Sequence, residues 1–174
     1  VNTAGTNNQE MAVAHSGKNV NDGLWHHVAM TWKSGSSNGF IAYFDGFATG
    51  LGLTTPAVQI PAIPASVWIG SHNGTSEFLN GTLDEVRIWN RILTPSEIQE
   101  RAASPRRLIG TDPQLLAYFP FNDAEPNGTR DVVTKQLALF RGMSASNRVV
   151  QDGIVFGDPA VRTIPNPAAA GLWL

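Results

Sequence analysis

The chain has 174 residues, which is enough for one domain with a proper core or for one domain and part of a second. Its 12 lysine and arginine residues nearly balance 14 aspartate and glutamate residues, giving a net charge of −2 and no electrostatic footprint for nucleic acid or an anionic membrane. Cysteine is absent, which excludes disulfides and thiolate metal sites, and no apolar run approaches the roughly 18 residues that span a bilayer.

The first ninety residues show the alternation of apolar and polar side chains that is typical of β-strands, and long helical periodicity is almost missing. In the strand predicted from Leu24 to Lys33, every second residue shares a face, so we expect Val28, Met30 and Trp32 to face the core. The next predicted strand, 39–44, runs into Asp45-Gly46, a dipeptide that favours a two-residue hairpin turn. The chain is therefore predicted to be all-β.

Further strands are predicted on both sides of a polar loop. The proline-rich segment 55–64 indicates an irregular or edge connection, after which residues 66–70 are expected to resume the sheet. The strand predicted for residues 82–89 places Glu85 and Arg87 on one face, where they can pair.

One helix is predicted, and its start is well marked. Thr94 is a good N-cap, Pro95 suits the first helical position, and Glu97 completes a capping box. The helix should run to about Ala103, because Ser104-Pro105 ends it.

These pieces together resemble a laminin-G-like module. Gly-Leu-Trp-His-His-Val stands at 23–28, the Asp-Gly turn at 45–46, Asp-Glu-Val-Arg-Ile-Trp at 84–89, and Thr-Pro-Ser-Glu-Ile at 94–98. The resemblance implies an antiparallel β-sandwich of the concanavalin-A-like jelly-roll type, with one short helix near residues 95–103. Folds of this kind usually bind ligands without catalysing a reaction.

The resemblance also implies a division of the chain. Residues 1–103 are expected to form one laminin-G-like sandwich and 104–114 a linker. Residues 115–174 would then begin a second repeat, since Leu-Leu-Ala-Tyr-Phe-Pro-Phe-Asn at 115–122 is similar to the opening strand of such a module, or would complete the first sandwich. The opening strands of the family do not precede residue 10, so three alternatives remain: an excerpt, replacement strands from 115–174, or strands donated by another chain.

Two parts of the sequence carry residue types that can bind a metal ion. The neighbours His26 and His27 point to opposite faces of a strand and could not share one ion, so we expect a structural role for them. The loop 71–77 corresponds to the loop that supplies calcium ligands in pentraxins, relatives with the same fold. The resemblance implies a calcium site here with oxygens from Asn73 and Glu77, which are ligand types that a hard cation prefers.

Aromatic side chains could offer stacking platforms for sugar rings, because a ring face matches the apolar face of a pyranose. Core packing competes with this role at each candidate: Trp25, Tyr43, Trp68, Trp89 and Tyr118. Trp89 is the preferred ligand-binding candidate, together with His72 in the polar loop.

Catalysis is not expected. The Glu-x-Asp-x-x-Glu strand of related glycosidases is absent, and Asp84 and Glu85 point to opposite faces. The predicted function is a non-catalytic recognition or adhesion module for carbohydrate or protein, carried in a larger exported protein that is extracellular, on the cell surface or periplasmic. The alternative is a scaffold subunit whose sheet edges pair with neighbouring chains.

Overall fold

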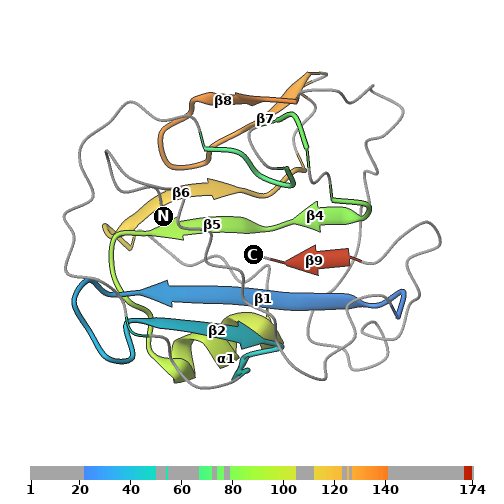
Figure 1. Cartoon of the computed structure of the whole chain (residues 1–174). Helices are drawn as coiled ribbons and strands as arrows, with labels where there is room; N and C mark the ends of the chain where they lie inside the picture. The colour runs from blue at the N-terminus through green and yellow to red at the C-terminus, as the bar shows by residue number, and fades with distance from the viewer. Residues whose placement is uncertain are drawn as a thin grey trace.

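The computed structural model describes residues 22–49, 54, 67–71, 74–76, 79–104, 112–122, 125 and 127–140, and the backbone of 171–173. Figure 1 shows strands lying roughly side by side with one short helix, α1. The helix covers Pro95–Ala103, and the strands are β1 (Trp25–Trp32), β2 (Phe40–Phe44), β3 (Phe47–Ala48), β4 (Thr82–Asp84), β5 (Val86–Trp89), β6 (Leu115–Phe119), β7 (Gly128–Arg130), β8 (Leu137–Leu139) and β9 (Gly171–Trp173). The predicted all-β class with one short helix is confirmed.

The predicted hairpin is also confirmed. β1 and β2 pair antiparallel, and β2 turns through Asp45 and Gly46 into β3. Both turn residues have positive φ, 49° and 86°, as a two-residue turn between twisted strands requires. A Cβ on Gly46 would lie 3.0 Å from the Gln99 backbone, so the turn packs closely against α1.

The largest sheet has five strands in the order β3-β2-β1-β9-β4. β9 pairs parallel with β1 on one side and with β4 on the other, with Gly171 opposite both Trp25 and Thr82. Segments far apart in the sequence therefore meet in one sheet, as Figure 1 shows.

The single strand predicted for residues 82–89 is wrong in one respect, since it is divided at Glu85. This residue has φ 59°, a left-handed conformation that breaks the strand, and its N–H donates to the Asp84 side chain at 2.9 Å. The predicted pair of Glu85 and Arg87 is confirmed as a buried ion pair. Tyr118, from β6, donates its hydroxyl to the same Glu85 carboxylate at 2.8 Å.

The core beside α1 contains Tyr43, Leu93 and Ile98, against which Ala29, Ile41 and Trp89 pack. The prediction that Met30 faces the core is wrong, because Met30 is 69% exposed, while Val28 and Trp32 are half-buried. Alternation identifies two faces of β1 but does not say which one the helix covers. The helix covers the face of Ala29.

The remaining expectations for the fold are met in part. Val67 to Gly70, expected in a strand, lie in irregular structure. β6 pairs antiparallel with β5, so the strand expected to open a second repeat is hydrogen-bonded to one from the first segment. Most of the linker and residues 141–170 lie outside the described residues, and the division into domains stays a prediction.

Candidate functional site

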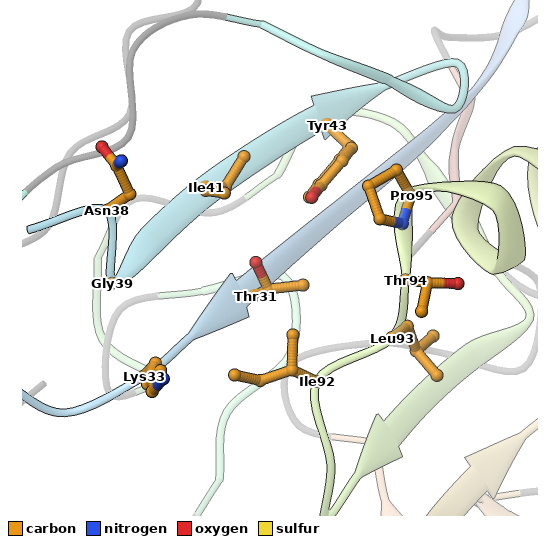
Figure 2. A pocket seen from close by; sticks show the side chains of 10 residues that line it. All are labelled: Thr31, Lys33, Asn38, Gly39, Ile41, Tyr43, Ile92, Leu93, Thr94 and Pro95. Carbon is orange, nitrogen blue, oxygen red and sulfur yellow. The ribbon is translucent and has the colours of Figure 1, made fainter. Parts of the chain in front are cut away.

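An open cavity of about 350 Å³ lies between β1, β2 and the segment that enters α1 (Figure 2). Its lining comes from three stretches of the chain, namely Thr31, Lys33, Asn38, Gly39, Ile41, Tyr43, Ile92, Leu93, Thr94 and Pro95.

Strand register places one wall of this cavity. Thr31 and Ile41 are partners across β1 and β2, so their side chains share a face of the sheet, and Tyr43 follows on that face. The turn between the strands is closed by the Lys33 N–H donating to the Gly39 carbonyl at 2.6 Å. The wall is therefore part of the hydrogen-bonded sheet.

The helix cap places the opposite wall. The Thr94 hydroxyl accepts the Glu97 N–H at 3.3 Å, and the Glu97 carboxylate accepts the Thr94 N–H at 2.7 Å. This capping box fixes Pro95 at the first helical position beside the cavity. The residue before the cap, Leu93, is anchored in the core, while Ile92 remains 48% exposed at the cavity.

The chemistry of the lining suits binding. Figure 2 shows the hydroxyls of Thr31 and Tyr43 turned toward the space bordered by Ile41, Ile92 and Pro95. Among the lining residues that the structure describes, Lys33 is the one charged residue, and none carries a carboxylate or an imidazole. This set can bury apolar groups and make a few polar contacts, but it holds no acid–base pair.

A separate polar cluster surrounds His26, which is 8% exposed. Its ring nitrogens lie 3.0 Å from Asp45 Oδ2 and 3.0 Å from Asp22 Oδ1, so a protonated imidazole donates to both carboxylates. Burial lowers and the two carboxylates raise the pKa of His26, and the net shift is upward. The Leu24 N–H and His26 hold the pKa of Asp22 below its usual value. In the structural role expected for it, His26 connects the Asp22 and Asp45 carboxylates.

Trp89, the preferred sugar-stacking candidate, is half-buried and packs against the core beside α1. The Arg101 and Arg91 guanidinium groups lie over its ring at 4.8 and 5.3 Å from the centroid. Arg91 is itself held by Glu97 at 2.7 Å and Asp112 at 2.9 Å. A sugar that stacked on Trp89 would compete with these two guanidinium groups for the ring. Sugar stacking stays a prediction.

The other candidates, His72, Asn73 and Glu77, lie outside the described residues. The described part of their loop is tightly turned: the Ser71 hydroxyl accepts the Gly74 N–H at 3.2 Å, and a Cβ on Gly74 would come within 2.3 Å of the Trp68 ring. No group of three or more His, Asp or Glu side chains suited to a metal ion occurs among the residues that the structure describes. Calcium binding stays a prediction.

Sequence reasoning missed the cavity. Its residues come from three separated stretches, and most are ordinary strand or turn residues. The one available signal was the capping box, which fixes where Ile92 and Pro95 lie relative to the helix. The face of β1 that α1 covers is the face of Ala29, which the strand pattern alone does not predict.

Comparison with known proteins gives a consistent picture. Residues 1–99 match the family described as the concanavalin A-like lectin/glucanases superfamily. The chain is 31% identical over 93 residues to the rat sushi, von Willebrand factor type A, EGF and pentraxin domain-containing protein 1, covering 49% of this chain and 3% of that protein. It is 34% identical over 99 residues to human neuronal pentraxin-1, covering 52% of this chain and 22% of that protein.

A third relative is guinea pig neuronal pentraxin-2, which is 29% identical over 99 residues, covering 52% of this chain and 23% of that protein. The chain thus spans less than a quarter of the length of each of these relatives. No solved structure matches the chain. No helix in the described part of the chain is long and apolar enough to cross a membrane.

Proposed function

Because the chain belongs to the concanavalin A-like lectin/glucanase superfamily, we propose that it is a non-catalytic recognition module that binds a carbohydrate or protein ligand. The observation that carries this proposal is the cavity between β1, β2 and the start of α1. Its described lining combines aliphatic walls with the hydroxyls of Thr31, Tyr43 and Thr94, the Asn38 amide and the Lys33 cation, and no pair of carboxylates, which glycoside hydrolysis needs, lies among these described residues. Such a lining supports binding.

We propose further that the module works outside the cytoplasm, as part of a larger exported adhesion protein. The support is the match to regions of proteins whose names include pentraxin.

The experiment for the proposed function is a screen of the purified chain on glycan and protein arrays. Ile92→Arg, which places a long cation at the exposed edge of the cavity, should abolish binding that uses it. Ile88→Arg is the matched control, because Ile88 is also partly exposed but lies on β5 away from the lining. Binding lost in both variants, or in neither, would remove the cavity from the proposal. A chain that binds nothing on either array would overturn it.

Calcium at the loop 71–77 is a second part of the proposal. Asn73 and Glu77 would hold the ion, with hydroxyl and carbonyl oxygens of the described Ser71, Thr75 and Ser76 as further oxygen donors of the kind that calcium prefers. A ligand that binds the folded state stabilises it, so millimolar calcium should raise the unfolding midpoint of the chain. Glu77→Gln should remove that rise, and an equal rise in this variant would place the ion elsewhere.

His72 and Trp89 remain proposed ligand contacts. His72→Ala should weaken array binding without changing the unfolding midpoint if it touches the ligand. Trp89→Phe keeps an aromatic ring in the core, so a selective loss of glycan binding at unchanged stability would support stacking, and unchanged glycan binding would count against it.

The scaffold alternative also has an observation in its favour. Large apolar side chains are exposed along β5, β6 and the β7–β8 hairpin, and they are Ile88, Leu116, Val132, Val133, Leu137 and Leu139. Such a surface is typical of a contact with another chain. Mass measurement in solution separates the two functions: a monomer favours the recognition module, and a defined oligomer favours the scaffold.

A further inference from the structure

We propose that the Trp68 ring is a stacking platform for a pyranose ring of a neutral carbohydrate, at a place apart from the cavity beside α1. This inference rests on the proposed function, and it names carbohydrate as the ligand class and Trp68 as the contact. Three features of Trp68 support it, namely the exposure of the ring, the glycine packed against it and the indole N–H.

Trp68 is more exposed than the other tryptophans whose side chains the structure describes. It is 41% exposed, whereas the other three are half-buried. The Trp89 ring is shared with two guanidinium groups, but within the described part of the chain no cation and no second aromatic ring contacts Trp68. An indole face left open in this way matches the apolar C–H face of a pyranose.

Gly74 lies against one face of the Trp68 ring. A Cβ placed on Gly74 would be 2.3, 2.6 and 2.9 Å from three adjacent atoms of the six-membered ring. Three such similar distances indicate an approach over the ring face, because an approach along the rim would bring one atom much closer than its neighbours. The exposed part of the side chain therefore belongs to its rim and its other face.

Backbone hydrogen bonds hold this glycine in place. Gly74 has φ 69°, a left-handed conformation that favours glycine, and its N–H donates to the Ser71 hydroxyl at 3.2 Å. The Leu79 N–H donates to the Gly70 carbonyl at 2.8 Å and closes the stretch that contains both residues. A ligand would consequently lose little binding free energy in ordering the ring.

The indole N–H favours a sugar over an aliphatic group. No described residue accepts a hydrogen bond from Trp68. The exposed Val67 and Leu79 make an apolar peptide the competing ligand. An aliphatic side chain laid on the ring would take water from the N–H without replacing it, which costs binding free energy. A pyranose carries oxygens around its edge, so it can cover the ring face and accept the N–H at the rim.

The surroundings of the ring also favour a sugar over a proline-rich peptide. Proline-rich segments dock in grooves lined with aromatic side chains, and Trp68 contacts no other aromatic ring among the described residues. Gly74 is instead followed by Thr75 and Ser76, which are exposed and carry hydroxyls. Hydroxyls both donate and accept hydrogen bonds, as the edge of a sugar does.

The test is an NMR titration of the ¹⁵N-labelled whole chain. It follows the indole N–H resonance of Trp68, which is assigned by its absence from the Trp68→Phe spectrum. The probes are three neutral trisaccharides, cellotriose, maltotriose and mannotriose. The controls are sorbitol, which carries similar hydroxyls on an open chain, and acetyl-Pro-Leu-Pro-amide. We expect at least one trisaccharide to shift the resonance to saturation, and the two controls to leave it unmoved.

Substitutions separate the ring from its N–H, with binding followed at the backbone amides of Gly70 and Ser71. Trp68→Ala should weaken binding about tenfold or more, as the loss of a central tryptophan contact does. Trp68→Phe keeps a ring but removes the N–H, so it should weaken binding about two- to tenfold. Gly74→Ala should displace the ring and weaken binding while the rest of the spectrum stays dispersed. Phe47→Ala is the matched control at another exposed aromatic residue and should change nothing.

The failures are distinguishable. If the peptide moves the Trp68 resonance and no trisaccharide does, the ligand class is wrong and the recognition function stands. If sorbitol moves it as far as the trisaccharides do, or if Trp68→Ala binds them like the unchanged chain, this inference is overturned alone. The same holds if nothing moves the resonance while the chain binds on the arrays. If the arrays are also blank, the proposed function fails with it.

Discussion

At the scale of single residues, His26 carries the clearest electrostatic arrangement in the described chain. Its ring connects Asp22, just before β1, to Asp45 in the hairpin turn, and Asp45 also accepts the His27 N–H at 3.0 Å. The Phe44 ring lies 4.6 Å from the imidazole. The start of β1 and the turn after β2 are therefore held together through the His26 side chain.

This arrangement predicts that stability falls as pH rises above 6.5, the ordinary pKa of histidine. The folded state raises the pKa of His26 above its ordinary value of 6.5. The stabilisation is thus complete below pH 6.5 and is lost as pH rises through the folded-state pKa. Urea unfolding midpoints between pH 5.5 and 8.5 should show this decline, and in Asp22→Asn the decline should be smaller and end at a lower pH. An identical slope in both proteins would rule out the His26–Asp22 pair as its source.

Tyr118 gives a second prediction at this scale. Its hydroxyl donates to Glu85, which is 1% exposed, and the Arg87 guanidinium lies 4.3 Å from its ring centroid. Burial and the nearby Glu85 charge raise the Tyr118 pKa. Tyr118→Phe keeps the ring but removes a hydrogen bond to a buried charge, so it should lower the free energy of unfolding by about 1.5 to 3 kcal/mol. Denaturant unfolding measures this, and a change below about 0.5 kcal/mol would contradict the buried bond.

At the scale of elements, α1 depends on its first turn. Thr94→Ala removes the hydroxyl of the capping box and should cost about 1 kcal/mol of stability. Thr94→Ser, which keeps the hydroxyl, is the matched control and should cost little. Equal losses in the two variants, measured by denaturant unfolding, would show that the methyl group and not the cap is responsible.

The same turn predicts a loss of stability in acid. The Arg91 side chain and the Thr94 N–H lower the pKa of Glu97 from 4.5 to about 2. A depressed pKa stabilises the fold above the unfolded value, and this contribution is lost as pH falls from about 4.5 toward 2. Unfolding midpoints across this range should fall less steeply in Glu97→Gln, which is neutral throughout. A wild-type slope retained in the variant would assign the acid sensitivity to other carboxylates.

These elements also show what the sequence can predict. The helix and the hairpin were predicted correctly because each depends on local groups, Thr94 with Glu97 and Asp45 with Gly46. The break at Glu85 was not, because this residue is buried against a distant segment, where its carboxylate accepts the Tyr118 hydroxyl 33 residues further along the chain. The face of Met30 was assigned wrongly for the same reason, since the helix that covers the other face follows β1 by more than sixty residues. Local chemistry predicts elements, and contacts between distant segments decide strand breaks, faces and the cavity.

At the scale of the whole molecule, β9 joins the two parts of the largest sheet. β1 and β4 do not pair with each other, and both pair with β9, so the backbone of 171–173 is the hydrogen-bonded link between the β1–β2 hairpin and β4 in this sheet. A strand in this position uses backbone groups on both of its edges. The sheet should therefore depend on the backbone of β9 as well as on its side chains.

Leu172→Pro tests this dependence. Proline removes a backbone donor of the ladder and leaves its acceptor without a partner, so we expect a loss of stability of about 1 to 3 kcal/mol. Leu172→Ala keeps the N–H and separates the backbone from the side chain. If Leu172→Pro and Leu172→Ala lower the stability equally, the backbone hydrogen bonds of β9 contribute nothing to it. If proline alone exposes the apolar surfaces and drives association, β9 is what keeps the sheet from pairing with other chains, because an opened sheet presents unpaired edges to them.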